Sequence, residues 1–265
     1  MLVVLVSSVT WGGALPEFGR PNQLSDSLQI NSENKVRYVT LKSEQDGIKD
    51  LKKLVMQSKV EEAWVYLPKI TTWIEVGTDE KAEIETITKE GRTYLKEAKV
   101  DEAIIWELAK TYAELILYHL HPFSSLRLRT TLNLMQTNSG KSVPKEIITE
   151  ERQKCLEEDA RPSSQDVIYA FTLARRIHGI NPYPDFSAKV VSRLGVTEQK
   201  INSSALEWDP EKAQRLLPML LGFYQTAQTN AMSEGGVSPE GFCQSVTSLG
   251  VELEFKSYKR LGINN

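Results

Sequence analysis

Residues 115–122 place the tightest constraint on how this chain folds. They read Leu-Ile-Leu-Tyr-His-Leu-His-Pro, an apolar, strand-forming run that ends in two histidines separated by one leucine. Side chains two positions apart in a strand lie on the same face of a sheet, so His119 and His121 are expected side by side. Pro122 has no backbone N–H and ends the strand pairing. The sequence therefore predicts a strand that carries two imidazoles to the end of a sheet, close enough to bind one metal ion.

Composition excludes several classes of protein. The chain has 265 residues, of which 40% are hydrophobic and 25% charged, as in an ordinary globular protein. A net charge of -3 with mixed signs shows no basic patch of the kind that binds nucleic acid. After the first residues, no run of about 18 apolar residues is present to span a bilayer. We therefore expect neither a nucleic-acid partner nor a stable membrane span.

The cysteines and the first residues bear on the compartment. Cys155 and Cys243 are far apart and fit no Cys-x-x-Cys pattern, so we expect free thiols and favour a reducing, cytoplasmic location. Residues 1–6 are apolar and residues 7–14 are small and polar. A buried first strand is the favoured interpretation, while a short signal peptide ending near Ala14 stays open.

The remaining patterns mix strands and helices. Residues 15–33 are rich in Pro, Gly, Asn and Ser and are predicted to form a loop. The expected strands are residues 36–41, 60–67, 70–76, 115–122, 188–194 and 251–258, with short ones at 83–87 and 91–95. The expected helices are residues 43–58, 101–110, 146–159, 165–177, 209–226 and 239–249. Strands interspersed with helices in this way indicate a single α+β or α/β domain.

A catalytic zinc ion usually takes three protein ligands and leaves one position for water. Asp166 is the best candidate for the third ligand, because it lies in the first turn of a predicted helix and can project toward the end of the sheet. Ser163 or Ser164 is expected to cap that helix, and Ser163, three residues before Asp166, is also a candidate to donate a hydrogen bond into the same space.

His119-Leu-His121-Pro122 followed by Ser163-Ser-Gln-Asp166 resembles the motif of the JAMM (JAB/MPN) metalloproteases, His-x-His-Pro … Ser-x-x-Asp. The expected order of helices and strands over residues 45–198 is similar to that of the family. The resemblance implies one α+β domain over residues 1–265, with a mixed, curved β-sheet flanked by helices, a JAB/MPN-like fold related to cytidine deaminase.

The resemblance also implies roles for individual residues. His119, His121 and Asp166 would hold Zn²⁺, Glu62 would be the general acid/base and Ser163 would support the oxyanion. Glu61 stays open as an alternative to Glu62, because neighbouring residues of a strand point to opposite faces and only one of them can serve. The implied activity is zinc-dependent hydrolysis of a peptide or isopeptide bond, with a protein or peptide substrate that includes ubiquitin-like conjugates among the candidates.

Two departures from the family pattern support a second hypothesis. Residues 123–160 separate the His-Pro from the Ser-x-x-Asp and are interpreted as an insertion that forms a lid or a partner-binding arm. The family's glycines after the glutamate are missing, since no glycine appears between Ala63 and Gly77. Residues 199–265 are interpreted as a C-terminal helical extension with a last strand. The alternative is therefore a catalytically silent, MPN-like interaction module.

Overall fold

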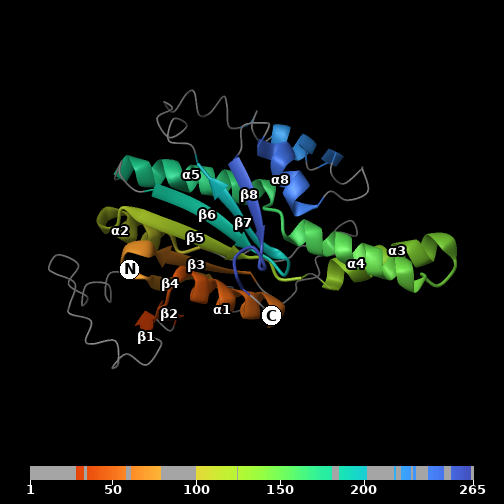
Figure 1. Ribbon diagram of the computed structural model, residues 1–265, viewed down its shortest axis with the longest axis horizontal. Coiled ribbons are helices and arrows are strands. Elements are labelled where there is room, and N and C mark those ends of the chain that lie inside the picture. Colours follow the sequence, from red (N-terminus) through yellow and green to blue (C-terminus); the bar gives the residue numbers. More distant parts are fainter. Residues whose placement is uncertain are drawn as a thin grey trace.

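The predicted histidine strand is strand β5, Glu114–Leu120, and it lies inside an eight-stranded sheet (Figure 1). The computed structural model describes residues 28–32, 35–57, 61–78, 100–123, 125–180, 185–201, 218, 222–227, 229–230, 238–247 and 252–263. Within these residues β5 pairs with β3 on one side and with β6 on the other. The strand that carries the histidines is therefore covered along both edges.

The sheet is mixed, and its strand order is β1-β2-β4-β3-β5-β6-β7-β8. The other strands are β1 (Leu28–Ser32), β2 (Lys35–Leu41), β3 (Glu62–Leu67), β4 (Thr72–Thr78), β6 (Asp185–Val191), β7 (Gly195–Lys200) and β8 (Glu252–Ser257). Among these strands β5 and β6 form the single parallel pair, and all other neighbours are antiparallel. The predicted α+β class with a mixed sheet is confirmed.

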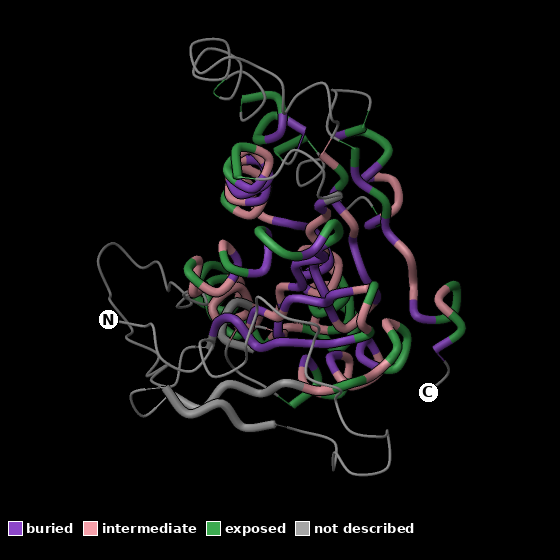
Figure 2. The backbone as a smooth tube through the Cα atoms, turned by 90° about the vertical axis from the view of Figure 1, so that its left-hand side faces the viewer, coloured by how far each residue is buried: buried purple, intermediate pink, exposed green. Residues whose placement is uncertain are grey.

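The alternation of side chains along β5 divides the core between two faces of the sheet. Leu115 and Leu117 pack against helices α2 (Glu102–Thr111) and α5 (Ser164–Ile180) on one face. Ile116 and Tyr118 pack on the other face against α1 (Glu44–Gln57). Buried segments gather in the central strands, whereas the surrounding helices carry exposed stretches (Figure 2). By this alternation His119 falls on the face that α5 covers.

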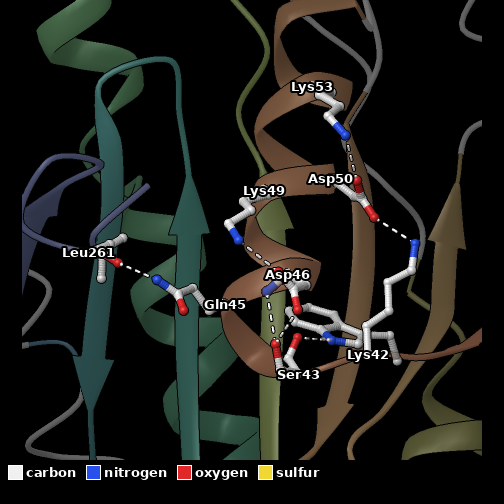
Figure 3. A network of polar contacts seen from close by, with 9 residues as sticks. Lys42, Ser43, Gln45, Asp46, Lys49, Asp50, Lys53 and Leu261 are labelled. Atoms are coloured by element: carbon white, nitrogen blue, oxygen red, sulfur yellow. Dashed lines mark hydrogen bonds and ion pairs between the residues drawn. The ribbon is translucent and has the colours of Figure 1, made fainter. Parts of the chain in front are cut away.

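Helix α1 is fixed at its N-terminus by local polar contacts (Figure 3). The hydroxyl of Ser43 accepts a hydrogen bond from the backbone N–H of Asp46 at 3.2 Å, so Ser43 caps the helix. The side-chain amide of Gln45 donates to the carbonyl of Leu261 at 3.1 Å. This contact joins the first turn of α1 to the segment that follows β8.

The long segment between β5 and α5 forms a helical hairpin. It consists of α3 (Ser125–Ser139) and α4 (Lys145–Asp159), which project together from one end of the sheet (Figure 1). The prediction of a helix over residues 146–159 is confirmed. Helix α3 was not predicted, because its mixed polar and apolar residues show no clear helical stripe and its packing is largely against α4.

Other parts of the chain extend the same sheet. Helix α8 (Pro239–Thr247) packs on β8, and together they bury Tyr224, Phe242 and Phe255.

The short 3-10 helix η1 (Pro68–Ile70) joins β3 to β4, where part of a strand was expected. The predicted loop over residues 15–33 is wrong for residues 28–32, which form β1, because pairing with β2 orders a stretch whose composition is polar.

Several predictions fall on residues that the structure does not describe. They are the strand or signal peptide within residues 1–14, the short strands at 83–87 and 91–95, and most of the helix at 209–226. Among the described helices, none combines the length and the apolar character that are needed to cross a membrane.

The close packing of α1 on the sheet makes a first prediction at Gly47. A Cβ atom at Gly47 would lie 2.0 Å from an indole carbon of Trp73, a buried residue whose ring packs against Tyr66 and Tyr118. We expect Gly47→Ala to lower the free energy of unfolding by about 1–3 kcal/mol, because either the helix or the indole must move. Urea denaturation followed by tryptophan fluorescence measures this change.

Gly179 provides the matched control, since it also lies in a helix but its added Cβ would meet nothing within 4 Å. Gly179→Ala is expected to leave stability unchanged or to raise it by about 0.5–1 kcal/mol through a better helix propensity. Equal effects of the two substitutions would contradict the packing argument.

Candidate metal centre

The two histidines lie together at the end of β5, as the sequence predicted. Their ring centroids are 4.9 Å apart. His119 is within the strand, and His121 follows it with its backbone N–H donating to the carbonyl of Val191 at 2.8 Å. The two side chains are only 19% and 12% exposed. Both imidazoles are therefore held by the sheet and largely shielded from water.

The carboxylate of Asp166 reaches both rings. Its Oδ1 lies 3.2 Å from Nδ1 of His119, and its Oδ2 lies 3.3 Å from Nε2 of His121. The parallel pairing of β5 with β6 explains this approach, because the chain must cross back over the sheet between them through α5. The N-terminus of α5 thus comes to the end of β5 at which the histidines lie. The three metal ligands proposed from the sequence are brought together.

The Ser-x-x-Asp sequence acts locally as a helix cap. The hydroxyl of Ser163 accepts from the backbone N–H of Asp166 at 3.1 Å, and the backbone N–H of Ser163 donates to Oδ2 of Asp166 at 2.6 Å. This reciprocal pair is a capping box with aspartate in place of the usual glutamate. The predicted Ser163 cap is confirmed, and the same contacts orient the carboxylate toward the histidines.

The helical hairpin rejoins the sheet beside this site. Nδ1 of His121 lies 3.1 Å from the carbonyl oxygen of Asp159, at the end of α4. Because a carbonyl oxygen only accepts, Nδ1 carries a proton, and Nε2, which faces Asp166, is the ring nitrogen that a metal ion would bind. The hydroxyl of Thr197 donates to the carbonyl of Ala160 at 2.5 Å. The end of the hairpin thereby fixes the orientation of one imidazole, as partners of metal-bound histidines commonly do.

The structure distinguishes the two glutamates at the start of β3. Ala63 is the register partner of His119, so Glu61, two positions earlier, points to the same face. Oε2 of Glu61 lies 3.1 Å from Nε2 of His119. Glu62 points to the opposite face, where its carboxylate accepts a hydrogen bond from the indole of Trp64 at 3.4 Å. Glu61, the alternative left open by the sequence, is the one that lies beside the histidines.

The charges of these groups are strongly coupled. Burial alone would lower the pKa of His119, but hydrogen bonds to Asp166 and Glu61 outweigh this and raise the pKa to about 10. Burial would raise the pKa of Asp166, but its hydrogen bonds to the two histidines hold the pKa well below its usual range. In the metal-free protein His119 is therefore an imidazolium between two carboxylates.

This set of side chains could hold a metal ion. Imidazole nitrogen and carboxylate oxygen are both among the common protein ligands of divalent metals, zinc included. Glu61, His119 and His121 each offer a ligand atom within 4.8 Å of the others, and Asp166 contacts both histidines. Each ring nitrogen of His119 faces a carboxylate, so one nitrogen can bind a metal while the other keeps a carboxylate partner.

Comparisons of the chain with protein-family models, with curated proteins and with solved structures found no significant match. The functional assignment therefore depends on the residues and geometry of the site.

The coupled charges predict how the stability of the metal-free protein depends on pH. The pKa of His119 is raised in the folded state, so its proton stabilises the fold fully below its unfolded value of about 6.5, and this contribution is lost as the pH rises toward 10. We expect wild type to be more stable than His119→Gln in EDTA at pH 6, and this difference to shrink steadily up to pH 10. Urea denaturation at several pH values measures it.

His178→Gln provides the control, because this histidine lies in the last turn of α5 and the substitution also removes an imidazole. An advantage of wild type over His119→Gln that grows with pH would contradict the imidazolium assignment.

Proposed function

We propose that this protein is a zinc-dependent hydrolase of peptide or isopeptide bonds with a JAMM-type site. The observation that carries the proposal is that the carboxylate of Asp166 lies close to the imidazoles of His119 and His121, although the α3–α4 hairpin separates these residues in the chain. Three convergent ligands of this type are the usual protein complement of a catalytic zinc ion.

In this proposal His119, His121 and Asp166 hold the metal. Zinc bound by such ligands lowers the pKa of a bound water toward about 7 and polarises a carbonyl oxygen. Asp166 is oriented for this role by its capping contacts with Ser163, and His121 by the carbonyl of Asp159. The site therefore needs little reorganisation of these side chains, which favours catalysis.

Glu61 is proposed as the proton carrier, in place of Glu62. Its carboxylate lies against His119, where it can accept a proton from the attacking water and pass it to the leaving nitrogen. Its side chain is 14% exposed, so it is partly shielded from bulk water. We assign the proton-carrying role to Glu61 because side chains alternate along β3, and Glu62 points away from the histidines.

Ser163 is compatible with support of the oxyanion. Its oxygen already accepts a hydrogen bond from Asp166, but a hydroxyl has one proton to donate and two lone pairs to accept with. The hydroxyl proton is therefore available to a developing oxyanion while the cap stays intact. A donor of this kind lowers the barrier by roughly 2.7–4 kcal/mol in acyl-transfer enzymes.

The second candidate, an MPN-like interaction module without activity, is favoured by the helical hairpin. Helices α3 and α4 project beside the site and expose Leu134 and Ile147, so the hairpin offers a surface that a partner protein could contact. An interaction module would keep its partner binding after the histidines are removed, whereas a hydrolase would lose its activity.

Metal analysis of the purified protein tests the proposed site. We expect about one zinc ion per chain, lost in His119→Ala and in Asp166→Ala, because each change removes one of the three ligands that the proposal assigns and leaves only two. Mass spectrometry of the metal content and titration calorimetry measure this. Full zinc occupancy in Asp166→Ala would contradict the proposed ligand set.

The glutamates test the catalytic role. Glu61→Gln is expected to retain zinc but to reduce peptide hydrolysis by about 10²–10⁴-fold, the usual contribution of a general base. Glu62→Gln is the matched control, with the same chemical change one residue away on the other face of β3, and should change hydrolysis little. A larger loss in Glu62→Gln would assign the role to that residue. Bound zinc without hydrolysis of a broad peptide library would favour the interaction module.

A further inference from the structure

A pocket of about 410 Å³ lies directly beside the candidate metal centre. His119 and Asp166 form part of its wall, and the rest comes from the first turns of α5 and the residue Pro162 before it, from Val100 and Glu102 at the start of α2, and from strands β3, β5, β6 and β7. The pocket is open because the side chains that face one another between α5 and the sheet are small. Ala170 on α5 lies opposite Ala63 and Ala188 on the sheet. The space is large enough for a side chain of many atoms and falls in the usual range for ligand sites.

The wall of this pocket is mainly apolar. Leu117 of β5 and Val190 of β6 contribute to it. In the pairing of these strands Leu117 lies beside Ala188, and Val190 lies beside His119. Two of its polar groups are already engaged within the protein. The amide of Gln199 donates to the carbonyl of Val167 at 3.2 Å, and the hydroxyl of Thr197 donates to Ala160. The hydroxyl of Tyr169, by contrast, is buried with no hydrogen-bond partner among the described residues. Apart from a group that reaches this hydroxyl, a polar group entering the pocket would lose its hydration with little return, whereas an apolar group would gain by burial.

Besides His119, three charged residues line the pocket. Asp166 lies at the metal centre, and Glu102 forms an ion pair with Arg176 at 3.0 Å. The ammonium group of Lys189 pairs with Glu44 at 2.6 Å and lies over the ring of Tyr118, so its charge is on the other face of the sheet. An occupant of the pocket would therefore have a polar, metal-binding end and an apolar body. Its polar end would meet the histidines, and its body would lie under α5.

We propose that this pocket binds a branched or aromatic apolar group of the substrate, attached next to the scissile amide. This inference rests on the proposed function and narrows the range of substrates that the proposed hydrolase would cleave. A glycine beside the scissile bond would leave the pocket empty, so amides with a bulky apolar residue at that position are preferred over glycine-terminated tails. Filling a pocket of this kind discriminates between substrates by about 10–200-fold in kcat/KM.

Hydroxamates test the pocket without a known substrate. Acetohydroxamic acid and 3-phenylpropanohydroxamic acid carry the same zinc-binding head, and only the second has an apolar arm. In calorimetric titrations of the zinc-loaded protein, we expect the phenyl compound to bind at least about tenfold more tightly, because its arm is buried beside the metal centre.

Substitutions at Ala188 locate the effect. Ala188→Phe and the smaller change Ala188→Leu fill the pocket from β6, and should remove most of the advantage of the phenyl arm while zinc binding stays intact. Ala113→Phe is the matched control, since Ala113 is exposed and precedes the opposite end of β5. It should leave the affinities for both hydroxamates unchanged.

The outcomes separate this inference from the proposed function. Zinc binding with equal affinities for the two hydroxamates would overturn the pocket assignment and leave the metal centre in place. An unchanged advantage of the phenyl arm in both folded Ala188 variants would overturn it as well. Failure of the wild-type protein to bind zinc would overturn the proposed function and this inference with it.

Discussion

The contact of Asp166 with two imidazoles is the interaction on which the rest of the site depends. The carboxylate lies in the first turn of α5, where the free N–H groups and the helix dipole favour negative charge. The capping contacts with Ser163 hold it there, and the crossover between β5 and β6 carries that helix N-terminus to the histidines. Helix capping and sheet topology, two ordinary features of folding, together assemble a ligand set.

Electrostatics links this arrangement to metal binding. His119 lies between two carboxylates, and in the metal-free protein its raised pKa keeps a positive charge in that position. A buried pair of carboxylates requires a compensating cation, which either a proton on the imidazole or a metal ion provides. The same charges that stabilise the metal-free fold therefore define a place where a metal ion could bind.

The helical hairpin shows how a long segment between two site residues is compatible with a compact site. Loop closure costs little more as a segment lengthens, so helices α3 and α4 can project from the sheet without displacing α5. Where the hairpin ends, the carbonyl groups of Asp159 and Ala160 receive hydrogen bonds from His121 and Thr197. The hairpin returns to the sheet through contacts that also orient the imidazole of His121. The pocket under α5 then adds an apolar surface beside the ligands.

The sequence by itself determined the local features. Strand alternation placed His119 and His121 on one face, and the Ser-x-x-Asp spacing predicted the helix cap at Ser163, because both depend only on neighbouring residues. Tertiary structure decided what depends on partners distant in the chain. The register of β3 on β5 selected Glu61 over Glu62, the pairing of β1 with β2 overrode a polar composition, and the pocket arose from small residues on separate elements. Such features depend on which helices and strands pack against one another. The sequence pattern of one segment does not reveal which surface of another segment will pack against it.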